Sequence, residues 1–524
     1  MIARAAATPD APAPSGAGFF DARATTPDGV EADFVVVGSG AGGGAAARAL
    51  ARGGARVVVL EEGPRVATAD LGSTALGTMA TLFRNQGKQT AFGRATTPLL
   101  QARCVGGGTL VNSAIIWRLP EAVLASWRDR FGLGDGFAPA ALEAAYETIE
   151  REMSVRPVVE GLTAGRQDAL MRDGAARAMI DGRFLHRSER GCRASGRCLH
   201  GCPHEAKQST AVNYLPRAVA DGAAVYANAA VERVVIERGR AVAVIGRATA
   251  SGGESAPGAP GQRRRFRVAA RRAVIVCASA VQSPNLLRRS GVRREHLGDH
   301  FMAHPGTALL AFYPQPVGAW SGASQGFEAL GLRDTLGAKM ESVNVPPEVA
   351  AARLPGAGRR LAAFVDRLDH AAIWMVAVRA EAEGRIRPSV LFGDHVAYDL
   401  TAADMDRVRQ GLRRLAEMHF LAGATEVVTG VHGLPELLRS IDEVRVFENA
   451  PLDPRAYSMV ASHLFGGCRA GREPRLSVVD PDLKVHGVDG LYVMDASVFP
   501  TNTGVNPQHG IMAIATVAAE RLVA

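Results

Sequence analysis

Cysteine is scarce in this sequence and unevenly distributed. Six cysteines occur in 524 residues, too few for a fold held together by disulfides. Three of them, Cys192, Cys198 and Cys202, lie in the segment GCRASGRCLHGCP. Structural zinc sites usually have short, paired spacings of Cys and His ligands, whereas this spacing is irregular. The segment therefore predicts a tight loop with reduced thiols or one disulfide, and a metal site is the less favoured alternative.

Long apolar runs are absent as well. No stretch approaches the roughly 18 uninterrupted apolar residues of a membrane-spanning helix. The N-terminal segment MIARAAATPDAPAPSGAG also lacks the apolar core of a secretory signal. We therefore expect a soluble, cytoplasmic protein with a flexible, Pro-rich arm over residues 1–30. Hydrophobic residues still make up 47% of the chain, enough for a large core divided between two lobes.

The charge of the chain points to no polyanionic partner. The net charge of +8 comes mostly from scattered arginines, so no nucleic acid partner is expected. The one dense run, Arg263–Arg265, follows a Gly- and Pro-rich segment and is interpreted as the base of a flexible hairpin tip. Aromatic residues amount to only 6%, which leaves no obvious aromatic cage for a cationic ligand.

The first motif that is present is a βαβ unit near the N-terminus. A short apolar strand over residues 34–37 leads into GSGAGG at 38–43, and an Ala-rich helix over 45–52 follows. A second strand over 56–60 ends at Glu61 and Glu62. Strand, glycines, helix, strand and terminal acid in this order are typical of a dinucleotide-binding unit.

Each glycine of the motif has its own physical role. Gly38 allows the tight turn, Gly40 lets the backbone approach a pyrophosphate, and Gly43 lets the helix pack on the strand. The helix N-terminus adds N–H groups and the positive end of its dipole. The Glu61 carboxylate is positioned to accept hydrogen bonds from both ribose hydroxyls, which disfavours a 2′-phosphate. The motif alone does not separate NAD from FAD.

Three later segments separate them. ARCVGGGTLVN at 102–112 contains glycines that let backbone pass close to a flat ring system. Residues 272–288 are predicted to form a buried strand followed by a helix. The C-terminal part contains SHLFGGCRAG, DGLYVMDASVFP and GVNPQHG. With these motifs the chain resembles the glucose–methanol–choline (GMC) oxidoreductases, flavoenzymes that oxidise alcohols, over about residues 33–524.

Within that family, the sequence motifs are most similar to those of the long-chain alcohol oxidases and dehydrogenases. GRCLHGCPHEAKQST resembles their Cys-rich segment, and HLFGGCRAG and GVNPQHG resemble the two catalytic segments. Val111 stands where some relatives carry a histidine that is linked to the flavin, so the resemblance implies noncovalent FAD. A small-molecule alcohol and oxygen or another electron acceptor are the implied partners; the oligomeric state stays open.

The resemblance also implies a catalytic pair. Removing hydride from an alcohol carbon requires a base for the hydroxyl proton, and imidazole suits that role near neutral pH. His463 is the predicted base. Asn506 is predicted to hold the substrate oxygen so that the carbinol C–H points at flavin N5. His509 is the alternative second residue, because it lies one helical turn from Asn506.

Asp495 is expected to contact the ribityl chain or the pyrophosphate, with capping of local backbone as the alternative. By the same resemblance, Val231 is expected to contact adenine through its backbone. The full set of cofactor-binding positions is Gly38, Ser39, Gly40, Ala41, Gly42, Gly43, Glu61, Glu62, Arg103, Gly107, Gly108, Asn112, Val231, Ala278, Asp495, Ala496, Asn506 and Pro507.

The predicted fold class is α/β (α+β overall), with a Rossmann-like FAD-binding domain and a second, substrate-binding domain of antiparallel sheet backed by helices. The FAD-binding domain is predicted over 31–120, 185–310 and 460–524. The substrate-binding domain and lid are predicted over 121–184 and 311–459. In the second domain we expect a strand over 371–378 and a helix from Thr401 to Ala422, with Thr401 and Asp404 capping its start.

Other functions remain as alternatives. A sterol or sugar hydroxyl could replace the aliphatic alcohol, or the flavoprotein could carry out a light-driven or other non-alcohol reaction on the same fold. The segment GASQG around Ser324 fits the pattern of a serine hydrolase. It lacks the buried strand that leads into a nucleophile elbow. Thiol redox chemistry would need a CxxC-like pair beside the flavin, which the cysteine spacing does not supply.

Overall fold

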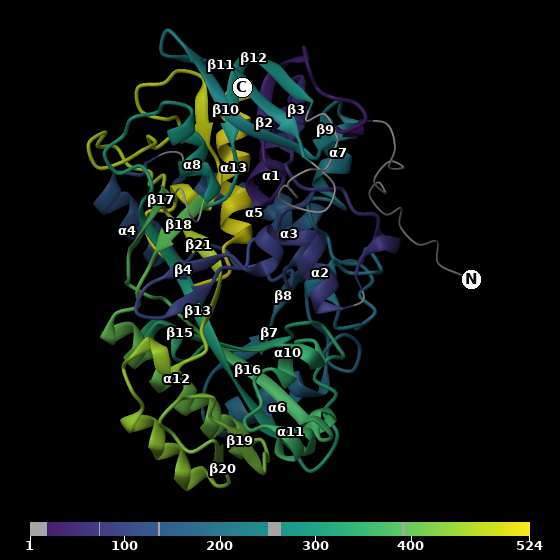
Figure 1. Ribbon diagram of the computed structural model, residues 1–524, viewed down its shortest axis with the longest axis vertical. Coiled ribbons are helices and arrows are strands. Elements are labelled where there is room, and N and C mark those ends of the chain that lie inside the picture. The colour runs from purple at the N-terminus through teal and green to yellow at the C-terminus, as the bar shows by residue number, and fades with distance from the viewer. Residues whose placement is uncertain (1–17, 73, 135–136, 250–263, 390–392) are drawn as a thin grey trace.

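The computed structural model describes residues 18–72, 74–134, 137–249, 264–389 and 393–524. The elongated molecule contains two large sheets, and helices cover them (Figure 1). The first sheet, in the upper half of Figure 1, carries the βαβ motif, and the second begins beside it on the left of the upper half and runs to the lower end. The predicted α/β class with a Rossmann-like part is confirmed.

The first sheet is parallel around the βαβ motif. Its order is β1-β9-β3-β2-β12-β11-β10, and β22 pairs with β12. The neighbouring strands β1, β9, β3, β2 and β12 run parallel, whereas β12, β11 and β10 form an antiparallel meander. The bounds are β1 Phe19–Asp21, β2 Glu31–Val37, β3 Val57–Leu60, β9 Ala224–Ala227, β10 Ala229–Glu237, β11 Arg240–Ala248, β12 Arg265–Val276 and β22 Leu491–Val493.

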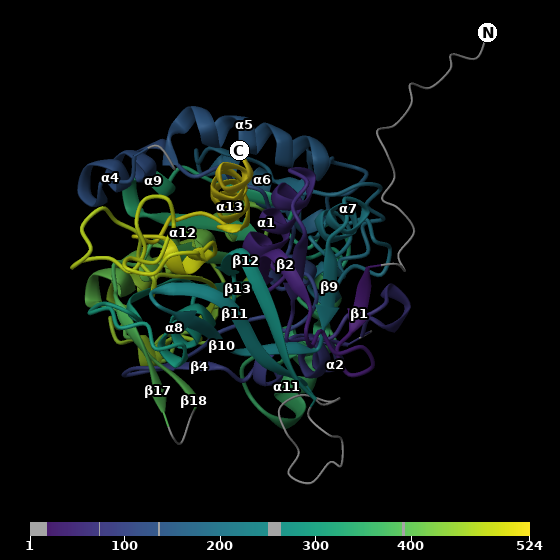
Figure 2. The ribbon, with the colours of Figure 1, turned by 90° about the horizontal axis from the view of Figure 1, so that it is seen from above.

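Two helices from opposite ends of the sequence cover this sheet side by side. Helix α1, Ala41–Arg52, follows β2, and α13, Gln508–Val523, closes the chain (Figures 1 and 2). Both are rich in alanine, so their backbones approach closely and join one core with the sheet. Around them lie α4 Glu121–Phe131, α5 Pro139–Glu152, α7 Tyr214–Ala220 and α8 Gln282–Arg289.

The second sheet is mixed but largely antiparallel. Its order is β5-β4-β18-β17-β13-β16-β15-β14-β7, and β19, β20 and β21 join beside β13. Among its strand pairs in the described residues, only β4 and β18 are parallel. The bounds are β4 Thr90–Phe92, β5 Thr96–Pro98, β7 Gly182–Phe184, β13 Asp299–Phe312, β14 Phe327–Ala329, β15 Ala338–Ser342, β16 Ala371–Val378, β17 Gly384–Ser389, β18 Gly393–Ala397, β19 Glu426–Val428, β20 Leu437–Leu438 and β21 Val460–Phe465. A separate pair joins β6 Val155–Pro157 to β8 His186–Ser188.

The longest helix backs this sheet. Helix α12, Ala402–Leu421, begins at a capping box in which Thr401 Oγ1 accepts from Asp404 N at 3.1 Å and Asp404 Oδ2 accepts from Thr401 N at 3.1 Å. Its apolar stripe joins the second core. The capped helix and strand β16 confirm two sequence predictions. The remaining helices are α2 Ala75–Leu82, α3 Gly108–Val111, α6 Arg166–Arg177, α9 Arg333–Leu336, α10 Pro347–Ala351 and α11 Gly358–Val365.

The cores divide the chain differently from the predicted domain boundaries. Strands β13 and β21 pair in the second sheet, although the sequence assigned residues up to 310 and from 460 to the FAD-binding domain. Helices α4 and α5 join the first core, although 121–184 was assigned to the substrate-binding domain. Pairing of distant strands and helices decides these memberships. The assignment of the two parts to FAD and to substrate stays a prediction.

The predicted arm over 1–30 also ends earlier than expected. Residues 1–17 lie outside the described residues, but Phe19–Asp21 forms β1 and pairs in parallel with β9. Strands β11 and β12 form the predicted hairpin, and its tip, with Arg263, lies outside the described residues. Among the helices that the structure describes, none is both long and apolar enough to cross a bilayer.

Candidate functional site

A cavity of about 910 Å³ is lined by residues from both sheets. The first sheet contributes Val37 and Leu60 from the ends of β2 and β3. The second contributes residues of β13, β16 and β21. We call the surface formed by Gly38–Gly42, Glu61 and Gly107 the glycine wall, and the surface formed by His463 and Asn506 the histidine wall.

Backbone forms most of the glycine wall. Gly38 has a φ of 99°, and a Cβ there would lie 2.3 Å from the Cys277 carbonyl oxygen. A Cβ on Gly43 would lie 2.0 Å from the Gly38 carbonyl oxygen, so this glycine lets α1 sit on the strand, as the sequence predicts. A Cβ on Gly107 would lie 2.8 Å from the Gly40 Cα. Two glycine-containing loops, far apart in the sequence, therefore face each other and leave a cradle free of side chains.

Glu61 fixes the turn that carries the glycines. Its Oε2 accepts from the backbone N of Ser39 at 3.1 Å and from Ser39 Oγ at 2.7 Å, and its Oε1 accepts from Gly63 N at 2.9 Å. Burial raises the pKa of the Glu61 carboxyl, and these hydrogen bonds oppose that shift. A carboxylate has about four lone-pair positions, so these three donors leave one position, on Oε1, for a further donor.

The neighbouring acid, Glu62, is engaged differently. It forms ion pairs with Arg84 and, at 3.9 Å, with Arg103. Glu62 and Arg84 line the cavity, whereas Arg103 does not. In the structure, the predicted cofactor residue Arg103 contacts the cavity only through Glu62.

Asp495 performs the capping that the sequence left as an alternative. Its Oδ1 accepts from Ser497 N at 2.8 Å at the start of a short 3-10 turn. Its Oδ2 accepts from Ser279 N at 3.0 Å and from Ser283 Oγ. Burial raises the pKa of Asp495. Because Asp495 also lines the cavity, these bonds tie the C-terminal segment to the loop after β12 at the cavity surface.

Most of the predicted cofactor positions lie on this one cavity. Gly43 and Arg103 do not line it, and Gly43 acts through packing. The positions that do line it are Gly38, Ser39, Gly40, Ala41, Gly42, Glu61, Glu62, Gly107, Gly108, Asn112, Val231, Ala278, Asp495, Ala496, Asn506 and Pro507.

His463 stands on β21 with a second histidine as its cross-strand partner. Strand register places it opposite His304 of β13, and the two Nδ1 atoms lie 3.2 Å apart. Burial, and secondarily the positive charge of Lys339, lower the pKa of His463 to about 3. The ring is therefore neutral at pH 7, and its Nε2 is directed toward Asn506. No motif around His304 pointed to this partner, because only strand pairing reveals it.

Asn506 sits in a loop held by its own hydrogen bonds, directly before α13. Asn502 Nδ2 donates to the Ala303 carbonyl oxygen at 2.7 Å, and Gly504 N donates to Asn502 Oδ1 at 2.9 Å. The Asn506 Nδ2 atom lies 3.5 Å from His463 Nε2. The structure thus brings together the two residues that the sequence predicted as a catalytic pair.

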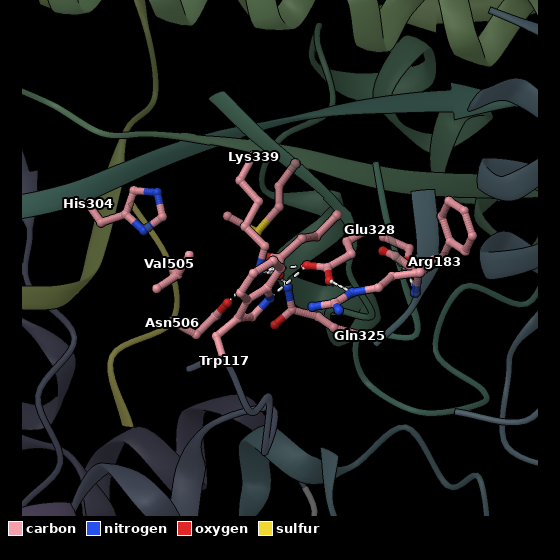
Figure 3. Close-up of polar contacts among 12 residues, drawn as sticks. Trp117, Arg183, His304, Gln325, Glu328, Lys339, Val505 and Asn506 are labelled. Carbon is pink, nitrogen blue, oxygen red and sulfur yellow. Dashed lines mark hydrogen bonds and ion pairs between the residues drawn. The ribbon is translucent and has the colours of Figure 1, made fainter. Parts of the chain in front are cut away.

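A buried charge cluster lies behind Asn506 (Figure 3). Lys339 of β15 is 1% exposed and donates to Asn506 Oδ1. Its Nζ also lies 2.6 Å from Glu341 Oε1 and 3.0 Å from Glu328 Oε2. Sequence reasoning missed this lysine because it carries no motif and approaches Asn506 across 167 positions of chain.

His509 does not belong to the cavity. It is 0% exposed and packs its ring 4.5 Å from that of Tyr146, centroid to centroid. Its Nε2 lies 3.8 Å from Glu150 Oε1, and it is not among the residues that line the cavity. Because α13 has already begun at Gln508, His509 points toward α5. We therefore do not retain it as a candidate for catalysis.

Apolar side chains form most of the part of the cavity contributed by the second sheet and the segment 314–356, and Thr307, Gln325 and Arg353 are among its polar residues. Its apolar residues include Leu309, Leu310, Val343, Val345, Val349, Leu354, Ile373, Met375 and Val428. It suits a hydrophobic ligand. The segment 314–356, predicted as an entrance loop or lid, contributes four of these residues; a closing motion stays a prediction.

The cysteines are free thiols in the structure. Cys192, Cys198 and Cys202 line a separate small pocket, where the Arg187 guanidinium donates to Cys198 Sγ at 3.1 Å. Burial opposes ionisation of Cys198, but the charges of Arg187 and Lys207 outweigh it and lower its pKa to about 7. Across the described residues, no group of three or more His, Cys, Asp or Glu side chains is arranged to hold a metal ion.

Comparisons with known proteins agree with this architecture. Residues 79–306 and 381–515 match the N- and C-terminal models of the GMC oxidoreductases, and residues 36–87 match an NAD(P)-binding Rossmann-like domain. The chain is 36% identical to an uncharacterised GMC-type oxidoreductase of Mycobacterium tuberculosis, over 96% of this chain and 77% of that protein. It is 26% identical to a long-chain-alcohol oxidase of Arabidopsis thaliana, over 94% and 67%. Pyridoxine 4-oxidase from Mesorbium loti shares the fold, with a TM-score of 0.70, 18% identity and coverage of 93% and 98%.

Proposed function

Because the chain belongs to the GMC oxidoreductase family, we propose that it catalyses FAD-dependent oxidation of an alcohol, primary and aliphatic or otherwise hydrophobic, to the aldehyde. The observation that carries the proposal is the cavity itself, because a glycine wall and a His–Asn pair line the same space. Oxygen or another acceptor would reoxidise the cofactor.

The residues present fit FAD. The cradle between Gly40 and Gly107 leaves room for a pyrophosphate at the start of α1, where backbone N–H groups and the helix dipole favour an anion. Glu61 would accept from a ribose hydroxyl through Oε1, and Val231 would contact adenine. Val111, on the same cavity, offers no nucleophile for a covalent link, which supports noncovalent binding. When bound, FAD supplies the hydride acceptor of the reaction.

The histidine wall would manage the proton. The His463 ring is neutral, and in the tautomer that carries its proton on Nδ1, toward His304, it would present Nε2 to the cavity as the acceptor for the hydroxyl proton of the substrate. Asn506 Nδ2 would donate to the hydroxyl oxygen and fix its position. The 3.5 Å between Nδ2 and Nε2 is long for a direct hydrogen bond, so a hydroxyl that bonds to both can replace this contact.

The apolar lining favours an aliphatic or otherwise hydrophobic alcohol over a sugar. Several Leu, Val, Ile and Met side chains line the cavity, and the hydroxyls of a sugar would lose water there with few polar side chains, such as Thr307 and Arg353, to replace it. The similarity to long-chain-alcohol oxidases supports the same class.

An anaerobic titration in the dark tests the proposal. The purified yellow protein would be mixed with primary aliphatic alcohols, secondary alcohols, sterols and sugars while flavin absorbance is recorded. We expect bleaching by primary aliphatic alcohols, and the speed of recolouring in air then separates an oxidase from a dehydrogenase. Bleaching only by sterols or sugars would replace the substrate class. A yellow protein bleached by no alcohol would overturn alcohol oxidation, and a colourless protein would overturn the FAD assignment.

A further inference from the structure

Lys339 makes a full set of hydrogen bonds although it lies outside the cavity. Its ammonium has three N–H donors, and three oxygens surround it: Asn506 Oδ1, Glu341 Oε1 and Glu328 Oε2. Each partner is at least 90% buried. Of the three, only Asn506 lines the cavity. The lysine is thus a buried cation with two carboxylate partners and one neutral partner, Asn506, which belongs to the histidine wall.

An ammonium donates hydrogen bonds and accepts none. Of the two polar atoms of the Asn506 amide, Lys339 can therefore bond only the oxygen. This leaves the Nδ2 group to face His463 Nε2, 3.5 Å away. We propose that Lys339 is a positioning residue, which rests on the proposed function: it fixes the Asn506 amide so that its N–H, not its carbonyl, faces the substrate oxygen and His463. The reversed amide would put two acceptors, Oδ1 and Nε2, against one hydroxyl that has a single proton.

The surroundings of Lys339 hold it in place. Trp117 Nε1 donates to Glu328 Oε2 at 2.9 Å, and Arg183 Nε donates to Glu328 Oε1 at 2.7 Å (Figure 3). Gln325 Nε2 donates to Glu341 Oε2 at 3.0 Å. The four carboxylate oxygens therefore all have partners, and two cations balance two anions. A buried network satisfied in this way is rigid, so the ammonium stays aimed at Asn506.

Lys339 also acts on His463 through its charge. The ionisable groups that face the two histidines are His304 and His463 themselves, Lys339 and, toward His304, Arg379. Lys339 is the charge that adds to burial in lowering the pKa of His463. It therefore disfavours protonation of the base before substrate binds. Removing this charge should raise the pKa of His463, so the acid limit of flavin reduction should move to higher pH.

The first test is a double-mutant cycle on the rate of anaerobic flavin reduction at saturating alcohol, well above the acid limit. Lys339→Met removes donor and charge, and we expect reduction to slow by about 10- to 100-fold with FAD retained. In an Asn506→Ala background the same change should alter the rate by less than about twofold, because the amide that Lys339 orients is gone. An equal loss in both backgrounds would overturn positioning through Asn506.

Two further variants separate the donor from the charge and from the cluster. Lys339→Gln keeps an N–H donor without charge, so it should recover part of the rate lost in Lys339→Met. If the Met variant does not fold, Lys339→Gln replaces it in the double-mutant cycle with Asn506→Ala. Both variants should show the raised acid limit. Arg183→Met is the matched control, because Arg183 bonds Glu328 as Lys339 does but does not contact Asn506. It should slow reduction far less than Lys339→Met does and should not reproduce the raised acid limit.

The outcomes distinguish this inference from the proposed function. Bleaching of the wild-type flavin and its loss in His463→Ala test the function alone. If both occur while Lys339→Met or Lys339→Gln reduces its flavin at the wild-type rate, the function stands and the positioning role is overturned. An unchanged acid limit in both variants would overturn the action of the charge on His463. An Arg183→Met loss as large as that of Lys339→Met would show that integrity of the cluster, not the contact with Asn506, is what matters.

Discussion

The glycine wall and the histidine wall face the same cavity but are built in different ways. In the glycine wall, backbone approaches backbone, as at Gly40 and Gly107, and side chains are largely absent. In the histidine wall, His463 of β21 and Asn506 of the loop before α13 meet. Each is contacted by a side chain far away in the sequence, His463 by His304 of β13 and Asn506 by Lys339 of β15. One wall depends on leaving atoms out, the other on aligning polar atoms.

This difference predicts different consequences of mutation. Added atoms should damage the glycine wall through binding and folding, because a methyl group there would either meet backbone, as at Gly38, or occupy the cradle, as at Gly40. Lost atoms should damage the histidine wall through rate, because the remaining groups still fold and still bind cofactor. Four experiments test this contrast.

The largest expected effect is on the histidine wall. His463→Ala should slow flavin reduction by about 100- to 10,000-fold while FAD stays bound, because the base is lost and the glycine wall is untouched. Stopped-flow absorbance with a saturating alcohol measures the rate, and the flavin spectrum of the desalted protein measures retention. Undiminished reduction would remove His463 from the mechanism.

A pair of glycine variants separates folding from cofactor binding. A Cβ on Gly43 would lie 2.0 Å from the Gly38 carbonyl oxygen, so Gly43→Ala should lower stability by about 1–3 kcal/mol and release FAD. A Cβ on Gly40 would meet only the Gly107 Cα, at 3.9 Å. Gly40→Ala should therefore keep the Tm of the apoprotein and still lose FAD. Normal FAD content in Gly40→Ala would show that the cradle does not receive the pyrophosphate.

A smaller effect is expected at Glu61. Glu61→Ala should weaken FAD binding by about 10- to 100-fold, the range for a lost hydrogen bond to a charged group, with near-normal reduction once FAD saturates. Glu62→Gln is the matched control at the end of the same strand, since Glu62 is paired with Arg84 and Arg103. Fluorescence titration of the apoproteins compares the two. Equal retention in Glu61→Ala and wild type would refute the ribose assignment.

The smallest effect on activity is expected at His509, which belongs to neither wall. Burial lowers its pKa from 6.5 to about 4, so the unfolded chain binds more protons between these values, and the contribution of the neutral ring to stability is lost as pH falls through that window. His509→Phe should keep reduction normal and make the Tm less dependent on pH between 6.5 and 4. A large loss of rate would return His509 to the site.

The glycine wall was predictable because its parts are contiguous. Strand, glycines, helix, strand and acid follow one another over residues 34–62, and local sequence suffices to specify such a unit. His463 and Asn506 were predicted only through motif resemblance, since nothing local distinguishes a catalytic histidine from a packed one. His509 illustrates this point, because one turn of α13 turns its ring onto Tyr146.

His304 and Lys339 could not be predicted from the sequence. His304 reaches His463 through the register of β13 with β21, and Lys339 reaches Asn506 from β15. Successive side chains of a strand point to opposite faces of the sheet, so a shift of the register by one residue would turn either side chain to the opposite face. The same pairings place β13 and β21 in the second sheet, against the predicted boundaries.

The sequence by itself determined the family, the βαβ unit and the glycine cradle, because these depend on local backbone geometry and contiguous residue types. The tertiary structure alone decided which histidine faces the cavity, which way the Asn506 amide points and which buried charges stand behind it. Those properties depend on contacts between strands that are distant in the sequence. Burial there strengthens the interaction of each charge with its partners and each hydrogen bond.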